Sequence, residues 1–142
     1  LVLAGTMPVL IGAAVLYNLV LHLLGFQPTL QDVAFIISDE TSPWLRAYFV
    51  LLAVVLAPVF EEILFRGMLL PALAKRFGAA ASVVAISLIF AGIHGHVSSL
   101  VPLFILSVSL CLAYIGTGSL VASMAMHAVF NGVTVALLLA VR

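Results

Sequence analysis

The sequence is short of charged residues and contains a single cysteine. Only 7% of the 142 residues are charged, with five Lys and Arg against five Asp and Glu, whereas a soluble domain carries about 25% charged residues. Without a basic excess or a low-complexity tract, the chain fits neither a nucleic-acid-binding protein nor a disordered one. The lone Cys111 excludes an internal disulfide. Together these absences exclude an ordinary soluble domain.

The chain is rich in apolar residues. They make up 65% of the chain, and the mean hydropathy is +1.40. A membrane-spanning helix needs about 20 residues, so this length accommodates about five or six of them. We therefore predict an all-α fold, a polytopic transmembrane helix bundle of about five to six helices that forms one domain over residues 1–142. The lipid bilayer is its expected surrounding.

The first part of this domain is predicted to be a helix and a polar loop over residues 1–43. An apolar run covers 1–24, and an acidic connection over 27–43 carries Phe35-Ile36-Ile37, which we expect at the membrane surface. The run 1–24 lacks a basic n-region and an obvious cleavage site. It is therefore expected to be the spanning helix of a trimmed domain, with a signal peptide as the alternative.

The second part, 44–141, holds the remaining predicted spans. The run 44–77 is too long for one straight span, since its residues rise about 50 Å. Pro58 is expected to kink or break it, and Pro71 to turn its tail toward the interface. Short connections make the later helices antiparallel neighbours, over 79–95, 99–115 and 119–141.

The basic residues say little about orientation. Lys75-Arg76 is the densest basic site, and the positive-inside rule puts it on the cytoplasmic side. Arg142 then falls on the opposite side of the membrane. Orientation stays open.

Three charged residues lie close together inside the run 44–77, namely Glu61, Glu62 and Arg66. A charge at the bilayer centre costs at least about 2.5 kcal/mol and is a functional candidate by default. Glu62 and Arg66 are four residues apart, so they share a helix face and can pair. Glu61 points about 100° away around the helix. This favours one structural acid and one chemical acid, with a buried ion network that does no chemistry as the alternative.

Polar residues on the later spans fall at a similar depth. His94 shares a helix face with Phe90, and His127 shares one with Asn131, because each pair is four residues apart. Counted along the helices from one end, Glu61 and these His and Asn side chains lie within a slab about 12–22 Å deep. They can therefore converge, although a mid-membrane His–Asn pair can also serve only to join helices.

Three motifs resemble those of the CPBP family of intramembrane proteases. That family comprises the CAAX prenyl proteases of the Rce1 type and bacterial relatives such as bacteriocin self-immunity proteins. Its first motif is two glutamates, then three residues, then an arginine; the second is Phe-x-x-x-His, and the third is His-x-x-x-Asn or Asp. They match, in order, Glu61-Glu62-Ile63-Leu64-Phe65-Arg66, Phe90-Ala91-Gly92-Ile93-His94 and His127-Ala128-Val129-Phe130-Asn131. The resemblance covers 44–141.

The resemblance implies an intramembrane endopeptidase that acts on a membrane protein or peptide. Glu61 would be the general base that activates water, assisted by His94. His127 and Asn131 would polarise the scissile carbonyl and stabilise the oxyanion. Glu62 and Arg66 would hold the site together. A prenylated C-terminus, a sorting-signal helix and a peptide precursor all fit as substrates, nucleic acid does not, and the expected location is a bacterial or archaeal cytoplasmic membrane.

The sequence leaves a metal site and two other functions open. Glu61, His94 and His127 could form a zinc site with an open water position. The chain lacks His-Glu-x-x-His, and these residues lie on three predicted helices, so we favour a mechanism that requires no cofactor. The other functions are a non-proteolytic immunity or scaffold protein of the same fold, and a small proton-coupled transporter. Transporters are usually larger and carry internal repeats.

Overall fold

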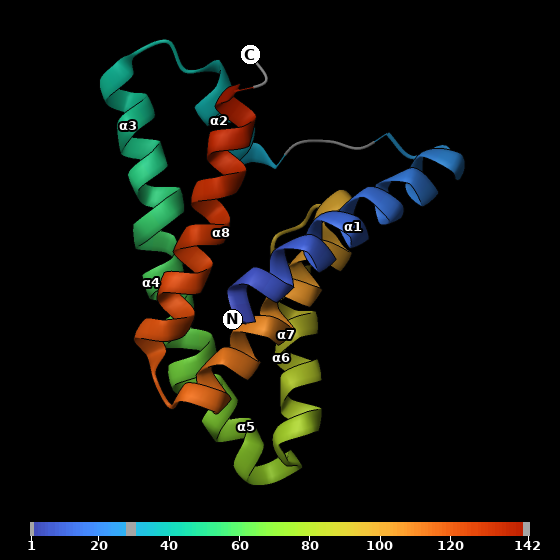
Figure 1. The fold of residues 1–142 in the computed structure, drawn as a ribbon, viewed down its shortest axis with the longest axis vertical. Helices are drawn as coiled ribbons and strands as arrows, with labels where there is room; N and C mark the ends of the chain where they lie inside the picture. Colours follow the sequence, from blue (N-terminus) through green and yellow to red (C-terminus); the bar gives the residue numbers. More distant parts are fainter. Residues whose placement is uncertain (1, 28–30, 141–142) are drawn as a thin grey trace.

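The computed structural model describes residues 2–27 and 31–140, with side chains from residue 5 onward, and all regular elements within them are helical (Figure 1). The predicted transmembrane helix bundle is confirmed. In chain order the elements are α1 (Val2–Leu23), α2 (Asp32–Asp39), α3 (Pro43–Leu51), η1 (Leu52–Leu56), α4 (Ala57–Glu62), η2 (Ile63–Leu69), α5 (Leu70–Phe77), α6 (Ala79–Ile93), η3 (Val97–Ser99), α7 (Leu100–Thr117) and α8 (Leu120–Ala140).

Four of the described helices are long and apolar enough to cross a membrane. They cover Gly5–Leu23, Pro43–Phe77, Val97–Thr117 and Leu120–Ala140. The fifth apolar helix, α6, has only 15 residues. The three helices expected after the long run are confirmed, and their described ends lie within two residues of the predicted ones. The predicted ends at residues 1 and 141 lie outside the described part of the chain.

The segment Pro43–Phe77 is one helix of 35 residues, so of the two outcomes expected at Pro58, a kink or a break, the break is wrong. Two stretches of this helix, η1 and η2, have π-helical hydrogen bonding, and each ends two residues before a proline. Proline lacks an N–H, and its ring clashes with the carbonyl four residues earlier. A π turn widens the helix just before the ring, so the helix continues through both Pro58 and Pro71.

The acidic connection contains a helix that the sequence did not predict. Helix α2 packs against α3 and α8. Ile37 is fully buried there, whereas Phe35 and Ile36 are exposed. The expected position at the membrane surface is therefore wrong for Ile37, which is buried within the protein.

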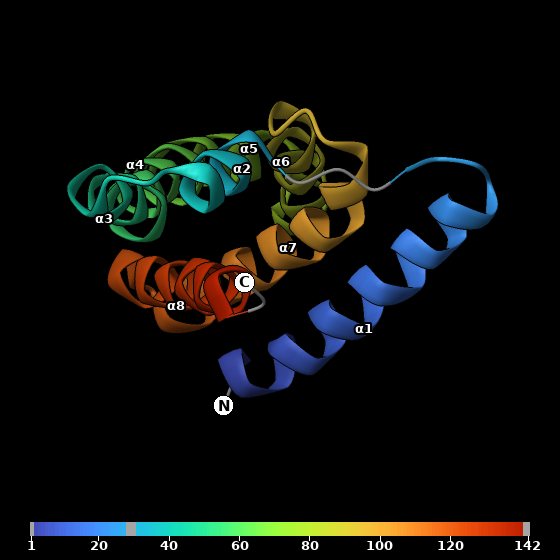
Figure 2. The same cartoon turned by 90° about the horizontal axis from the view of Figure 1, so that it is seen from above.

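The helices form layers that bring the long helix against α8. Seen from above, α7 and α8 lie between the long helix with α6 on one side and α1 on the other (Figure 2). Contacts between elements agree: α7 packs on α1, α6 and α8, while α8 packs on η1 and α4. Left-handed φ angles of 79° at Gly78 and 66° at Gly118 close the short turns on either side of the α6–α7 pair.

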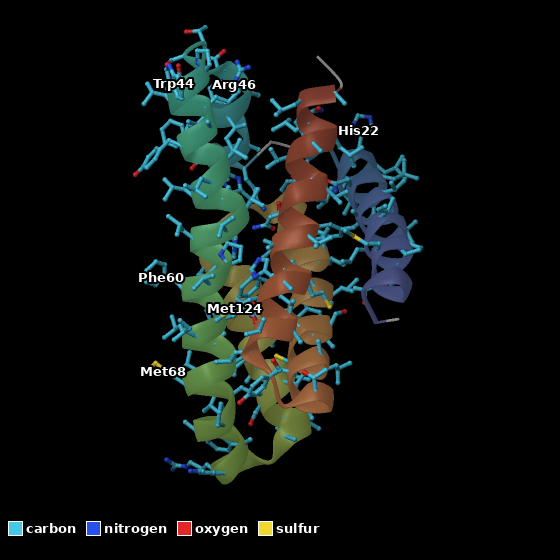
Figure 3. The ribbon with its side chains drawn as sticks, turned by 60° about the vertical axis from the view of Figure 1, so that its left-hand side comes forward. His22, Trp44, Arg46, Phe60, Met68 and Met124 are labelled. Atoms are coloured by element: carbon cyan, nitrogen blue, oxygen red, sulfur yellow. The ribbon has the colours of Figure 1, made fainter. Side chains whose placement is uncertain are left out.

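The long helix has one face turned outward and one turned inward. Phe60 and Met68 point away from the bundle and are 71% and 61% exposed (Figure 3). Glu62 and Arg66 lie on the other face with no exposed surface. Since exposed apolar side chains of a membrane bundle contact lipid, the charged residues of this helix are directed into the protein.

Candidate functional site

Arg66 is fixed by bonds to two different helices. Its Nη1 donates to Oε1 of Glu62 at 2.8 Å, which confirms the predicted pairing one turn apart. Its Nη2 donates to the carbonyl oxygen of Ser107 at 2.9 Å and to the Ser107 hydroxyl at 2.7 Å. All three side chains are fully buried. Arg66 thus links the long helix to α7.

His127 lies between the two glutamates. Its Nδ1 is 3.0 Å from Oε1 of Glu62, and its Nε2 is 3.8 Å from Oε2 of Glu61. Glu61 and Glu62 project from the helix in different directions, yet their two carboxylates approach the two nitrogens of one imidazole. A carboxylate oxygen can only accept, so the shorter contact assigns a hydrogen to Nδ1 and leaves Nε2 facing Glu61.

The side chains of the two glutamates differ in exposure and in the bonds that they make. Glu62 is fully buried and bound by both Arg66 and His127, whereas the Glu61 side chain is 28% exposed. The contact from Glu61 to His127 is longer than a hydrogen bond. Glu61 is therefore the carboxylate that can accept a bond from water or from a substrate.

His94 stands at the end of α6 and faces the same centre. It is the C-cap of that helix, which ends one residue earlier, and its Nδ1 donates to the carbonyl of Phe90 at 2.7 Å. This bond leaves Nε2 as the acceptor of a neutral ring. The Phe90 ring lies 4.8 Å from the His94 ring and 5.8 Å from the His127 ring, centroid to centroid. Glu61 is within electrostatic reach of both histidines.

Asn131 lies one turn after His127 but bonds elsewhere. Its Nδ2 donates to the carbonyl of Ala53 in η1 at 2.8 Å. Asn131 and Ala53 also line a cavity of about 140 Å³, whose other walls come from α2, from α8 and from Gln31 before α2. None of Glu61, His94 or His127 borders this cavity. The structure thus brings Glu61, Glu62, Arg66 and His127 into direct contact and places Asn131 at the edge of the group.

The sequence did not identify Ser107 or Ala53 as partners of the site. Ser107 lies 41 residues from Arg66, and Ala53 lies 78 residues from Asn131. A signal for Ser107 was available, because a serine in the middle of an apolar span must find a hydrogen-bond partner. Ala53 acts through its backbone and leaves no such signal.

The zinc alternative depends on how Glu61, His94 and His127 are arranged. Within the described part of the chain, no group of three His, Cys, Asp or Glu side chains is arranged to hold a metal ion. His127 already uses Nδ1 on Glu62, and His94 uses Nδ1 on its own helix.

Comparison with known proteins identifies the family. The model of the type II CAAX prenyl endopeptidase Rce1-like family matches residues 43–133. No curated protein and no solved structure matches the chain. The match covers well over half of the sequence and contains all three motifs of the site. The chain is thus an integral membrane protein and belongs to the Rce1-like family of CAAX-type proteases.

Proposed function

We propose that this protein is an intramembrane endopeptidase that uses Glu61 to activate water against a peptide bond of a membrane-associated substrate. The observation that carries the proposal is the contrast between the two glutamates. Glu62 is fully buried and its Oε1 is bonded to both Arg66 and His127, whereas Glu61 is partly exposed beside the same imidazole. A fixed ion pair next to a free carboxylate supports a division between a structural acid and a general base.

The hydrolysis divides among these side chains as follows. Glu61, assisted by His94, takes a proton from water, and the resulting hydroxide adds to the scissile carbonyl carbon. His127, whose Nδ1 hydrogen is bonded to Glu62, also carries a hydrogen on Nε2 in this scheme and donates it to the oxygen on which negative charge develops. Donors of this kind contribute most where water is excluded. Collapse of the tetrahedral species breaks the C–N bond, and the proton held by Glu61 passes to the leaving amine.

One amide hydrogen of Asn131 bonds to the carbonyl of Ala53. An oxyanion role for Asn131 would use the other hydrogen of the same amide.

Glu62 acts indirectly in this scheme. Its bond to Nδ1 of His127 fixes which ring nitrogen faces Glu61. Arg66 in turn keeps the Glu62 carboxylate neutralised by an opposite charge.

The test is cleavage by the purified chain in liposomes. The probe is an internally quenched peptide that carries an S-farnesyl cysteine in a C-terminal C-a-a-X sequence, and a second probe lacks the farnesyl group. We expect Glu61→Gln, His94→Ala and His127→Ala each to lower kcat/KM by at least about a hundredfold, the range for loss of a general base or an oxyanion donor. Asp39→Asn, an exposed acid on α2, is the matched control and should stay near wild type.

Two results would contradict the proposal. One is a Glu61→Gln variant that cleaves at the wild-type rate, since its amide cannot accept the proton of water. The other is a wild-type chain that cleaves neither probe, which is the behaviour expected of the immunity, scaffold and transporter alternatives. Comparison of the two probes reports whether the substrate must be lipidated.

A further inference from the structure

The carbonyl of Ala53 has no donor within its own helix. In an α-helix it would accept from the N–H of Ala57, and in a π-helix from that of residue 58. The N–H of Ala57 bonds to Leu52 instead. Residue 58 is a proline, which has no N–H to give. The π turn and the proline together leave this carbonyl without a backbone partner.

Asn131 supplies the donor from another helix. Its Nδ2 lies 2.8 Å from the Ala53 oxygen, and because that oxygen is a carbonyl, the amide nitrogen must be the atom that faces it. In a spanning helix, a backbone group that a proline leaves without its donor is satisfied by a neighbouring helix, a polar side chain or an ordered water. The Asn131 amide does this for the turn before Pro58.

This contact lies directly beside the carboxylates. Glu61 and Glu62 follow Pro58 by three and four residues, while His127, which contacts both, precedes Asn131 by one turn of α8. Helix α8 therefore holds the long helix at two levels, one on each side of the proline. The two helices are in contact there, since a Cβ added to the neighbouring Gly132 would lie 3.5 Å from the Val54 side chain.

We propose that Asn131 is a positioning residue whose side-chain amide replaces the N–H that Pro58 lacks, and so fixes the helical turn from which Glu61 and Glu62 project. The effect on catalysis rests on the proposed function. The effect on the backbone of residues 52–62 does not.

The proposal predicts that removing the proline makes Asn131 dispensable. In Asn131→Leu the Ala53 carbonyl loses its donor. In the double variant Pro58→Ala/Asn131→Leu, the new N–H at residue 58 can donate to Ala53 or Val54 and close the helix by itself. Thr134→Val is the matched control on α8, because the Thr134 hydroxyl donates to the carbonyl of Phe130 in its own helix.

Two readouts separate this inference from the proposed function. Hydrogen exchange over residues 52–62, measured in nanodiscs, needs no substrate. Asn131→Leu should exchange there about ten- to hundredfold faster than wild type, the factor for an unsatisfied buried carbonyl, and the double variant should return to within about threefold of Pro58→Ala alone. Thr134→Val should match wild type.

Activity on the farnesylated probe is the second readout. Asn131→Leu should lower kcat with KM unchanged, and the double variant should recover the part of the loss that comes from the backbone of the long helix. Unchanged exchange in Asn131→Leu would overturn the inference, as would a loss of activity that Pro58→Ala does not restore, because both point to Asn131 acting only on the substrate. If wild type cleaves no probe, the proposed function fails while the exchange experiment still decides the role of Asn131.

Discussion

Replacement of Arg66 by methionine tests how the buried charges stabilise the fold. Arg66 has no exposed surface, makes one bond to Glu62 and two to Ser107, and stacks with its Cζ 5.1 Å from the Phe90 ring centroid. Methionine keeps the apolar stem and removes the charge. The variant leaves the Glu62 carboxylate buried with only His127 as a partner.

The expected loss follows from that uncompensated charge. Removing one partner of a buried ion pair costs about 3–5 kcal/mol. The lower end applies here, because Glu62 keeps its bond to His127 and because polar groups in membranes find partial substitutes when unfolded. We therefore expect Arg66→Met to lower the free energy of unfolding by about 3 kcal/mol. The double variant Glu62→Gln/Arg66→Met carries no unpaired charge and should recover about 2 kcal/mol of this loss.

Cys111 is a natural reporter for the measurement. It is the only cysteine in the sequence and is fully buried on α7, so a thiol reagent reaches it only when the bundle opens. Labelling is followed across an SDS titration in mixed micelles, and each variant is normalised to its rate in the unfolded limit. A loss of 3 kcal/mol corresponds to an opening constant about 150-fold larger.

Arg46→Met is the matched control. Arg46 is only half-buried near one end of the long helix, where it donates to the backbone of Glu40 (Figure 3), and it should cost less than about 1 kcal/mol. The reasoning is refuted if Arg66→Met stays within about 1 kcal/mol of wild type. It is also refuted if the double variant is as unstable as the single one, since the cost then comes from lost packing and not from the charge of Glu62.

The two remaining predictions concern helix packing and metal dependence. A Cβ on Gly67 would lie 3.3 Å from Cδ1 of Leu120, so Gly67→Ala should lower the free energy of unfolding by about 1 kcal/mol in the same labelling titration. A Cβ on Gly92 would meet no atom within 4 Å, so Gly92→Ala should be neutral or raise the free energy of unfolding by about 0.5–1 kcal/mol. Equal shifts for both glycines would contradict the close packing of the long helix on α8. Treatment with 1,10-phenanthroline should leave cleavage of the farnesylated probe unchanged, since Glu61, His94 and His127 are not arranged around one point; loss of cleavage that zinc restores would show the metal-dependent alternative to be correct.

Local spacing was enough to predict the contacts within single helices. The Glu62–Arg66 pair follows from their separation of four residues, and the structure has that bond at 2.8 Å. The spans follow from apolar runs bounded by glycine turns. Both kinds of inference need only helix geometry and the length of a bilayer crossing.

Contacts between helices could not be predicted in the same way. Helices α6, α7 and α8 are apolar around most of their circumference, so they carry no polar stripe that would define their rotation about the axis. Without that rotation, neither the approach of His127 to both glutamates nor the bond from Arg66 to Ser107 can be derived. Helix α2 was overlooked for a related reason, because its stability depends on packing against α3 and α8.

Pro58 illustrates why one rule about proline was misleading in this chain. The expectation of a break considered only the hydrogen bond that proline removes from its own helix. The structure contains two further features, a π turn that makes room for the ring and an asparagine on α8 that bonds to the freed carbonyl. We therefore expect the turn before Pro58 to depend on α8 for its stability. Because the same helix α8 also carries His127, the continuity of the backbone and the alignment of the carboxylates depend on a single packing interface.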